Sequence, residues 1–199
     1  MTKTIDYYFA LISPFAYVGD AELTKMAERH GATIRRRPVE LGKIFPETGG
    51  IPLPKRSPAR QAYRLVELDR VSKFRGVEIN LQPKFFPAAE WPAAGMVVAA
   101  EKQGLDSGAL VNGILKACWT EERDIADVDT LKAIAEERGL DGQALLDAAK
   151  DEVIKAAYSA NTEEALAAGV FGSPSYVYND EVFWGQDRLE YLDRALGDK

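Results

Sequence analysis

The sequence predicts an α/β fold with a helical domain inserted into it. Residues 4–41 show a strand, a helix and a second strand, which predicts a βαβ unit with a right-handed crossover and a parallel strand pair. Residues 92–169 have helical apolar spacing almost throughout, and strand patterns return only after residue 174. The predicted boundaries are 1–41 and 169–199 for the two parts of the α/β domain, and 42–168 for the insert.

Composition indicates an ordinary globular protein. The chain has 199 residues, of which 46% are hydrophobic and 28% charged. Its net charge of -6 argues against a nucleic-acid-binding surface, although Arg35, Arg36 and Arg37 are expected on a strand with a solvated edge. No apolar run reaches the roughly 20 residues of a membrane span, and no signal peptide is recognisable. We therefore expect a cytoplasmic protein with neither nucleic acid nor membrane as a partner.

The chain has one cysteine, Cys118, and one histidine, His30. It therefore has no material for an intrachain disulfide, a Cys-x-x-Cys motif or a His-based metal site, and we predict no bound metal. His30 precedes Gly31, a typical helix C′ residue, so we expect this histidine to complement the negative end of its helix. Cys118 falls on the apolar face of the predicted helix 107–119 and is expected to be buried.

The junction at Ser13 and Pro14 separates the first strand, residues 4–12, from the first helix, residues 14–30. Serine is a favoured N-cap and proline suits the first helical position, so the pair predicts the helix start. Free N–H groups and the helix dipole converge beside the Ser13 hydroxyl, where they would stabilise a thiolate or a small carboxylate. Capping alone is the other interpretation, and taken by itself the motif favours it.

The remaining elements follow from periodicity and from residues that break helices. Residues 32–41 form the second predicted strand, and the density of proline and glycine predicts a loop over 42–58. The helices are expected at 59–74, 92–104, 107–119, 129–139, 141–149 and 150–168, with an irregular passage over 80–91. A hairpin over 175–184 and a closing helix over 186–196 end the chain.

Pro174 directly precedes the hairpin, where its missing N–H cannot interrupt a strand ladder. The bond from Ser173 to this proline is of the type that is occasionally cis, and cis forms usually serve a defined site.

This order of elements, with Gly172-Ser173-Pro174 before the hairpin, resembles the thioredoxin fold with the helical insert of the disulfide-oxidoreductase superfamily. Redox members carry Cys-x-x-Cys at the start of the first helix, whereas this chain carries Ser13-Pro14-Phe15-Ala16. Together with Trp184-Gly185-Gln186-Asp187-Arg188-Leu189, that run resembles the kappa-class glutathione transferases and, more closely, the 2-hydroxychromene-2-carboxylate isomerases. The resemblance spans nearly the whole chain.

The resemblance implies glutathione as the cofactor and Ser13 as the catalytic residue that contacts its sulfur. Because the only histidine lies at the far end of the same predicted helix, Ser13 is a poor nucleophile but a good hydrogen-bond donor to a thiolate. The backbone of Ser173 is implied to pair with the cysteinyl unit, and Gln186 and Asp187 are implied to hold the γ-glutamyl end. The glutathione-binding residues implied in this way are Ser13, Ser173, Pro174, Trp184, Gln186 and Asp187.

Lys55 and Arg56 fall near the loop positions that touch the substrate in the isomerases, where a cationic pair would hold an aromatic carboxylate. Solvated loop charges are the alternative. Two departures from the family pattern stand out: Gly49-Gly50 replaces a usual asparagine after the second strand, and Ser173 replaces a usual aliphatic residue. The remaining tryptophans, Trp91 and Trp119, are expected in the core rather than at a ligand.

Three functions remain open on these residues. The first is a glutathione-dependent isomerase acting on an aromatic carboxylate, and the second is a kappa-type transferase that conjugates glutathione to electrophiles. The third is a non-catalytic binder of thiol peptides that retains only the fold. The resemblance also implies a homodimer. With a single thiol, the chain is expected to lack dithiol-disulfide oxidoreductase activity.

Overall fold

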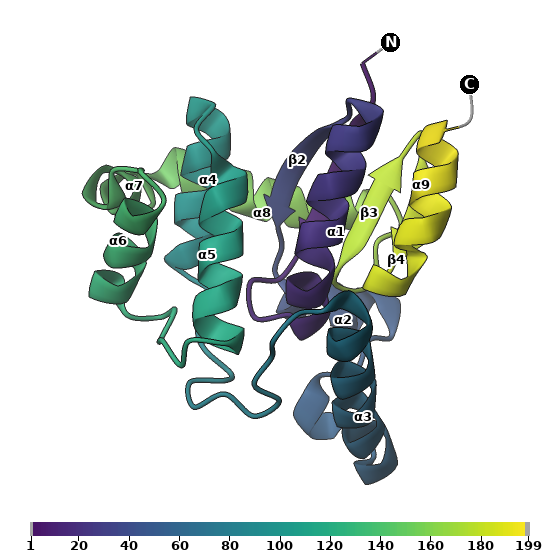
Figure 1. Cartoon of the computed structure of the whole chain (residues 1–199). Coiled ribbons are helices and arrows are strands. Elements are labelled where there is room, and N and C mark those ends of the chain that lie inside the picture. The colour runs from purple at the N-terminus through teal and green to yellow at the C-terminus, as the bar shows by residue number, and fades with distance from the viewer. Residues whose placement is uncertain (1, 198–199) are drawn as a thin grey trace.

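The computed structural model describes residues 2–197 and contains a four-stranded mixed sheet (Figure 1). The strand order is β2-β1-β3-β4, in which β1 runs parallel to β2 and antiparallel to β3, and β3 pairs antiparallel with β4. Residues far apart in sequence are thereby neighbours, since Tyr7 lies opposite both Arg36 and Tyr176. The strands are β1 Thr4–Phe9, β2 Thr33–Pro38, β3 Ser175–Tyr178 and β4 Glu181–Trp184.

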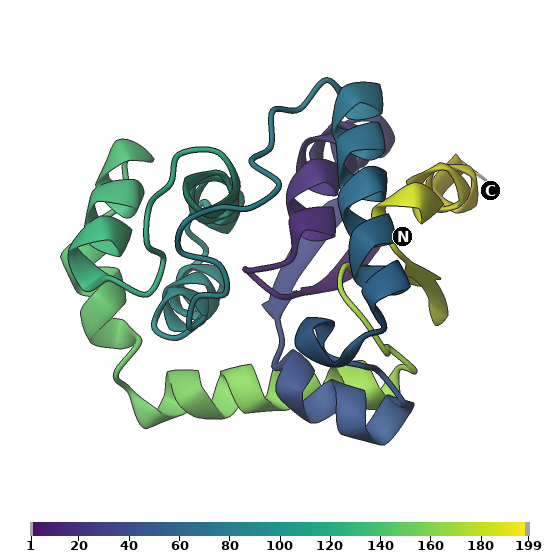
Figure 2. The ribbon, with the colours of Figure 1, turned by 90° about the horizontal axis from the view of Figure 1, so that it is seen from below.

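Helices cover both faces of the sheet and one of its edges (Figure 2). The helices α1 and α9 lie on one face, α8 crosses beneath the other, and α4 to α7 gather beside β2. The helices are α1 Pro14–His30, α2 Leu41–Thr48, α3 Pro58–Arg75, α4 Ala93–Gln103, α5 Ser107–Trp119, α6 Val128–Glu137, α7 Gly142–Ala148, α8 Glu152–Ala167 and α9 Leu189–Gly197, with short 3-10 turns at Leu53–Lys55 and Gln186–Arg188. No helix within residues 2–197 is long and apolar enough to cross a membrane.

One continuous core joins the sheet to the helices beside it. It contains Tyr7, Phe9 and Tyr176 from the strands, together with Met96 of α4 and Trp119 of α5. Burial of this shared apolar surface, rather than intrinsic helix propensity, holds short helices such as α6 and α7 in place.

The predicted loop over 42–58 is wrong in its first part, where α2 forms with Pro46 inside it. A proline inside a helix removes one backbone hydrogen bond. Ile44 is fully buried in a second apolar cluster with Tyr8 and Val39, under the opposite face of the sheet, and this burial outweighs the loss. Gly49, with φ of 75°, ends the helix. The other predicted elements are confirmed to within three residues at each end.

The two ends of α1 are stabilised as the sequence predicts. Ser13 accepts a hydrogen bond from the Ala16 N–H, and Gly31 adopts the left-handed conformation with φ of 60°. His30 approaches Asp193 of α9, with 2.7 Å between Nε2 and Oδ1. The histidine therefore joins two helices at the end of α1 that is remote from Ser13.

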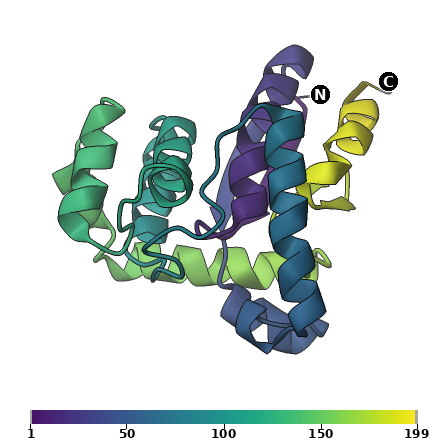
Figure 3. The same cartoon turned by 60° about the horizontal axis from the view of Figure 1, so that its bottom comes forward.

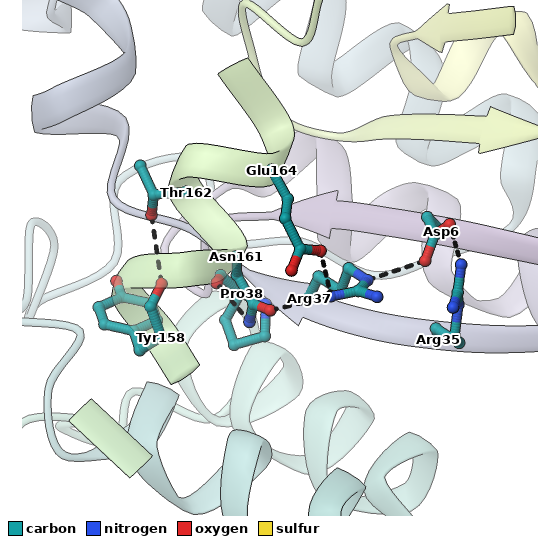
Figure 4. Close-up of polar contacts among 8 residues, drawn as sticks. All are labelled: Asp6, Arg35, Arg37, Pro38, Tyr158, Asn161, Thr162 and Glu164. Atoms are coloured by element: carbon teal, nitrogen blue, oxygen red, sulfur yellow. Dashed lines mark hydrogen bonds and ion pairs between the residues drawn. The ribbon is translucent and has the colours of Figure 1, made fainter. Parts of the chain in front are cut away.

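Arg35 and Arg37 of the edge strand β2 both make ion pairs (Figure 4), but only Arg37 is largely shielded, since its side chain is 21% exposed and that of Arg35 is 50% exposed. Arg35 and Arg37 both pair with Asp6 on the neighbouring strand. Arg37 also reaches α8, where it lies 2.7 Å from Glu164 and donates to Asn161 at 3.2 Å. Because α8 supplies these two partners, Arg37 fastens the sheet to that helix.

Candidate functional site

The candidate site is centred on the turn between β1 and α1. The turn is closed by a hydrogen bond of 3.0 Å from the Ser13 N–H to the Ala10 carbonyl. Ser13 is only 8% exposed, and its Oγ accepts from the Ala16 N–H at 3.2 Å. The same hydroxyl donates a long hydrogen bond, 3.4 Å, to the Ser173 carbonyl. The N-cap side chain is thus directed at a segment 160 residues later in the chain.

The Ser173–Pro174 peptide bond is cis and lies against this turn. The Ser173 Oγ accepts a hydrogen bond of 2.9 Å from the N–H of Ala10, a residue with no exposed surface. A buried N–H needs a partner, so the Ser173 side chain has a definite structural task. The Pro174 carbonyl in turn accepts from the Gly185 N–H at 2.8 Å, which positions the start of the final helical segment.

Glu90 completes the turn and was missed by the sequence analysis. Its Oε2 accepts from the Leu11 N–H at 2.5 Å and from the Ile12 N–H at 3.4 Å. Burial raises the pKa of this carboxyl to about 7, although the two N–H groups favour its charged form. Glu90 lies in the irregular passage before α4, and no local pattern connects it with a turn 79 residues earlier.

Gln186 and Asp187 follow Gly185 but differ in accessibility. Gln186 is buried, its Oε1 accepts from Nε of Arg75 at 3.2 Å, and its backbone carbonyl accepts from Nη2 at 2.9 Å. These bonds fasten α3 to the turn before α9, so the Gln186 side chain is already engaged. The Asp187 side chain is 58% exposed and, within residues 2–197, pairs only with the adjacent Arg188, which leaves it open to a ligand.

Trp184 has no hydrogen bond with Ser13 or Ser173 in the described chain. Its indole packs against Gly172, where a Cβ would come within 2.4 Å of Nε1, and its ring is 4.8 Å from that of Phe171. It is 51% exposed and lines a hollow of about 530 Å³ together with Tyr191, and neither Ser13 nor Ser173 lines that hollow.

Lys55 and Arg56 lie beyond α2, just before α3, and have different surroundings. Lys55 is exposed, whereas the Arg56 Nε donates to the Ile51 carbonyl at 2.8 Å. Burial, with a smaller effect of Arg60, lowers the pKa of Arg56. Neither residue has a hydrogen bond or ion pair with Ser13 or Ser173 in the described chain.

The local backbone explains why glycine occupies positions 49 and 50. A Cβ at Gly50 would lie 2.2 Å from the Phe45 ring, so the backbone there leaves no room for a side chain. Gly49 has open space around it but needs a positive φ. An asparagine at position 50 would therefore displace Phe45.

Cys118 is buried as predicted, and burial raises the pKa of its thiol to about 12. The charge of Glu90 adds to this effect. The thiol is therefore protonated and inaccessible near neutral pH. No group of three or more potential metal-ligating residues occurs within residues 2–197.

The chain matches the model of a known protein family along almost its whole length. Residues 4–197 match the family model described as "DSBA-like thioredoxin domain". The chain belongs to this family. The thioredoxin-like fold expected from the resemblance is thereby confirmed.

The relatives narrow the assignment within this DsbA-like family. A 2-hydroxychromene-2-carboxylate isomerase of Sphingobium xenophagum is 30% identical over the full length of both chains. The isomerase of Pseudomonas putida is also 30% identical, over 97% of this chain and 94% of its own. Glutathione S-transferase kappa 1 of Caenorhabditis elegans is 26% identical over 96% of this chain and 90% of its own. The chain therefore belongs with the 2-hydroxychromene-2-carboxylate isomerases, and these relatives are all enzymes.

Solved structures agree with this placement. A 2-hydroxychromene-2-carboxylate isomerase superposes with a TM-score of 0.78 at 28% identity, covering 98% of this chain and 94% of that one. The cytosolic disulfide reductase DsbM from Pseudomonas aeruginosa with GSH has a TM-score of 0.70 at 17% identity, covering 98% of this chain and 100% of that one, which shows the shared fold alone.

Proposed function

We propose that the protein is a cytoplasmic, glutathione-dependent isomerase that acts on an aromatic carboxylate of the 2-hydroxychromene-2-carboxylate type. The observation that carries the proposal is the Ser13 hydroxyl at the start of α1, directed at the carbonyl of Ser173 before the cis Pro174. The isomerase relatives, similar over the full chain, support the same reaction.

The residues at the turn fit a bound thiolate. The Ser13 hydroxyl holds its present acceptor only at 3.4 Å, so it can turn to donate to a sulfur anion. The N-terminal N–H groups of α1 add the field of the helix dipole. Since His30 is engaged at the opposite end of the helix, no imidazole is available to make Ser13 itself a nucleophile. Ser13 therefore acts as the hydrogen-bond donor that keeps the sulfur ionised.

The segments on either side of the β3–β4 hairpin hold the rest of the tripeptide. The Ser173 backbone presents a carbonyl beside the turn for β-type pairing with the cysteinyl unit. The exposed carboxylate of Asp187 suits the ammonium group of the γ-glutamyl end. When bound, glutathione supplies a thiolate that adds to the substrate, allows ring opening and bond rotation, and departs unchanged.

The substrate carboxylate belongs at the cations before α3. Arg56 is shielded and orders its guanidinium against the Ile51 carbonyl, whereas Lys55 is exposed. A guanidinium also binds a carboxylate with two parallel hydrogen bonds, which an ammonium cannot do. Arg56 is therefore the stronger of the two proposed substrate contacts.

A kappa-type glutathione transferase is the second candidate, favoured by the 26% identity to the enzyme of Caenorhabditis elegans. One assay separates the two functions. An isomerase converts chromene carboxylate while the glutathione concentration stays constant, whereas a transferase consumes one glutathione for each product formed. A protein that binds glutathione without lowering its thiol pKa, and turns over neither class of substrate, would contradict both proposals.

A further inference from the structure

Arg64 is a partly buried cation of α3 without an acidic partner in the described chain. Its guanidinium lies over two aromatic rings, 5.4 Å from the centre of Phe86 and 5.7 Å from that of Trp119. Another arginine of the same helix, Arg70, pairs with Glu67 in the ordinary way. Withdrawing an unpaired guanidinium from water is unfavourable, and aromatic faces compensate for this only in part.

A second cation, Arg56, directly precedes the N-cap of α3, the helix that carries Arg64 in its second turn. Burial lowers the pKa of Arg64 to about 10, and the positive charge of Arg56 contributes to the shift. Both groups remain protonated at neutral pH, so two like charges are held near one another in a partly buried place. Such an arrangement is relieved when an anion binds between the cations.

The rings under Arg64 connect it with the turn before α1. Phe86 lies four residues before Glu90, whose carboxylate binds that turn. Thr120, the residue after Trp119, shares a hydrogen bond with the Tyr17 hydroxyl, and Tyr17 lies one helical turn beyond the start of α1. Figure 3 shows α3 running beside α1, with the segment that contains Phe86 crossing from α3 to the helices beside the sheet. The two rings that hold Arg64 therefore belong to segments that contact the first turn of α1 and the turn before it.

We propose that Arg64, supported by Arg56, binds the carboxylate of the aromatic substrate. This inference rests on the proposed function and names the residue that selects an acid. Trp119 is fully buried and serves as a rigid base under the guanidinium, while Phe86 is only partly covered and can touch the substrate ring. Because the rings hold the guanidinium in place before binding, little side-chain entropy is lost when the carboxylate docks.

Binding of 2-naphthoate, an inert aromatic carboxylate, tests the proposal by calorimetry. Arg64→Gln should weaken naphthoate binding by about 10- to 100-fold, as expected for one charge-assisted contact. Arg64→Lys should lose less naphthoate affinity, because lysine keeps the positive charge but cannot form the two parallel hydrogen bonds of a guanidinium. The matched control is Arg70→Gln on the same helix, which should bind naphthoate as the parent does. The neutral 2-naphthylmethanol should show the same affinity for all four proteins.

Three outcomes overturn the inference. Unchanged naphthoate affinity in folded Arg64→Gln, judged by circular dichroism, would return Arg64 to a structural role. If Arg64→Gln does not fold, unchanged affinity in both Arg64→Lys and Arg56→Gln has the same meaning. An equal loss of glutathione affinity would assign the cations to the glycyl carboxylate of the tripeptide.

Failure of the proposed function gives a different result. In that case naphthoate binding still depends on Arg64, while chromene carboxylate is not converted. That result would support the binding of an aromatic acid by Arg64 and would contradict the proposed isomerase activity.

Discussion

The two ends of the candidate site are built in opposite ways. At the turn end, formed by Ser13, Glu90 and Ser173, polar groups are joined by hydrogen bonds across the chain. At the cation end, formed by Arg56 and Arg64, positive charges are partly buried without an acid in the described chain. The difference indicates that the first end is a rigid frame, which exists before any ligand binds, and it is consistent with our proposal that an anion completes the second end.

Glu90→Gln is expected to have the largest effect of the variants considered, because it should remove a loss of folding stability that the parent shows as the pH rises. The pKa of Glu90 is raised from 4.5 to about 7, so between these values the folded chain holds a proton that the unfolded chain has lost. Stability therefore falls as the pH rises through this window, by about 1–3 kcal/mol after allowance for water that still reaches the carboxylate. Glutamine keeps an acceptor for the turn and cannot ionise, so the variant should not show this loss.

The measurement is chemical denaturation from pH 4 to pH 8, with Glu47→Gln at an exposed position of α2 as the control. Parallel stability profiles for the parent and Glu90→Gln would show that Glu90 does not titrate in this range.

Ser13→Ala tests the proposed role of the Ser13 hydroxyl as hydrogen-bond donor to the thiolate. It removes one hydrogen bond to the thiolate, worth about 1.5–3 kcal/mol, so the pKa of bound glutathione should rise by roughly one to two units. Thiolate absorbance as a function of pH measures this change. Ser57→Ala is a matched control, because Ser57 also precedes a proline and accepts from the Arg60 N–H as the cap of α3. Identical titration in Ser13→Ala and the parent would leave Ser13 as a cap only.

Arg56→Ala and Lys55→Ala compare two neighbouring cations at the other end. Arg56 is shielded and ordered, so its loss should lower kcat/KM for chromene carboxylate by about 10- to 100-fold. Lys55 is exposed, and its loss should change kcat/KM by less than about threefold, as for a solvated charge. Glutathione affinity should hardly change in either variant. Equal losses in the two variants would contradict the assignment to Arg56.

Cys118→Ala should have the smallest effect. The thiol is buried and protonated, so glutathione-dependent turnover should match that of the parent. Neither protein should catalyse insulin reduction at the rate of a dithiol enzyme. Rapid insulin reduction by the parent, lost in the variant, would show that this thiol becomes accessible.

Local sequence rules determined most of the fold. Ser13 and Gly31 set the ends of α1 through capping, and the position of Pro174 before the hairpin follows from its missing N–H. These rules act over a few residues and need no knowledge of distant partners. They failed at Pro46, because burial of Ile44 in the tertiary structure outweighed a local helix breaker.

Only the tertiary structure decided what surrounds Ser13. The partner of the Ala10 N–H is Ser173, and that of the Leu11 N–H is Glu90, at sequence separations of 163 and 79 residues. Arg64 likewise looks like any other helical arginine until Phe86 and Trp119 are placed under it. Hydrogen bonding, desolvation and like-charge repulsion depend on which groups meet in space, and packing of the whole chain decides those meetings.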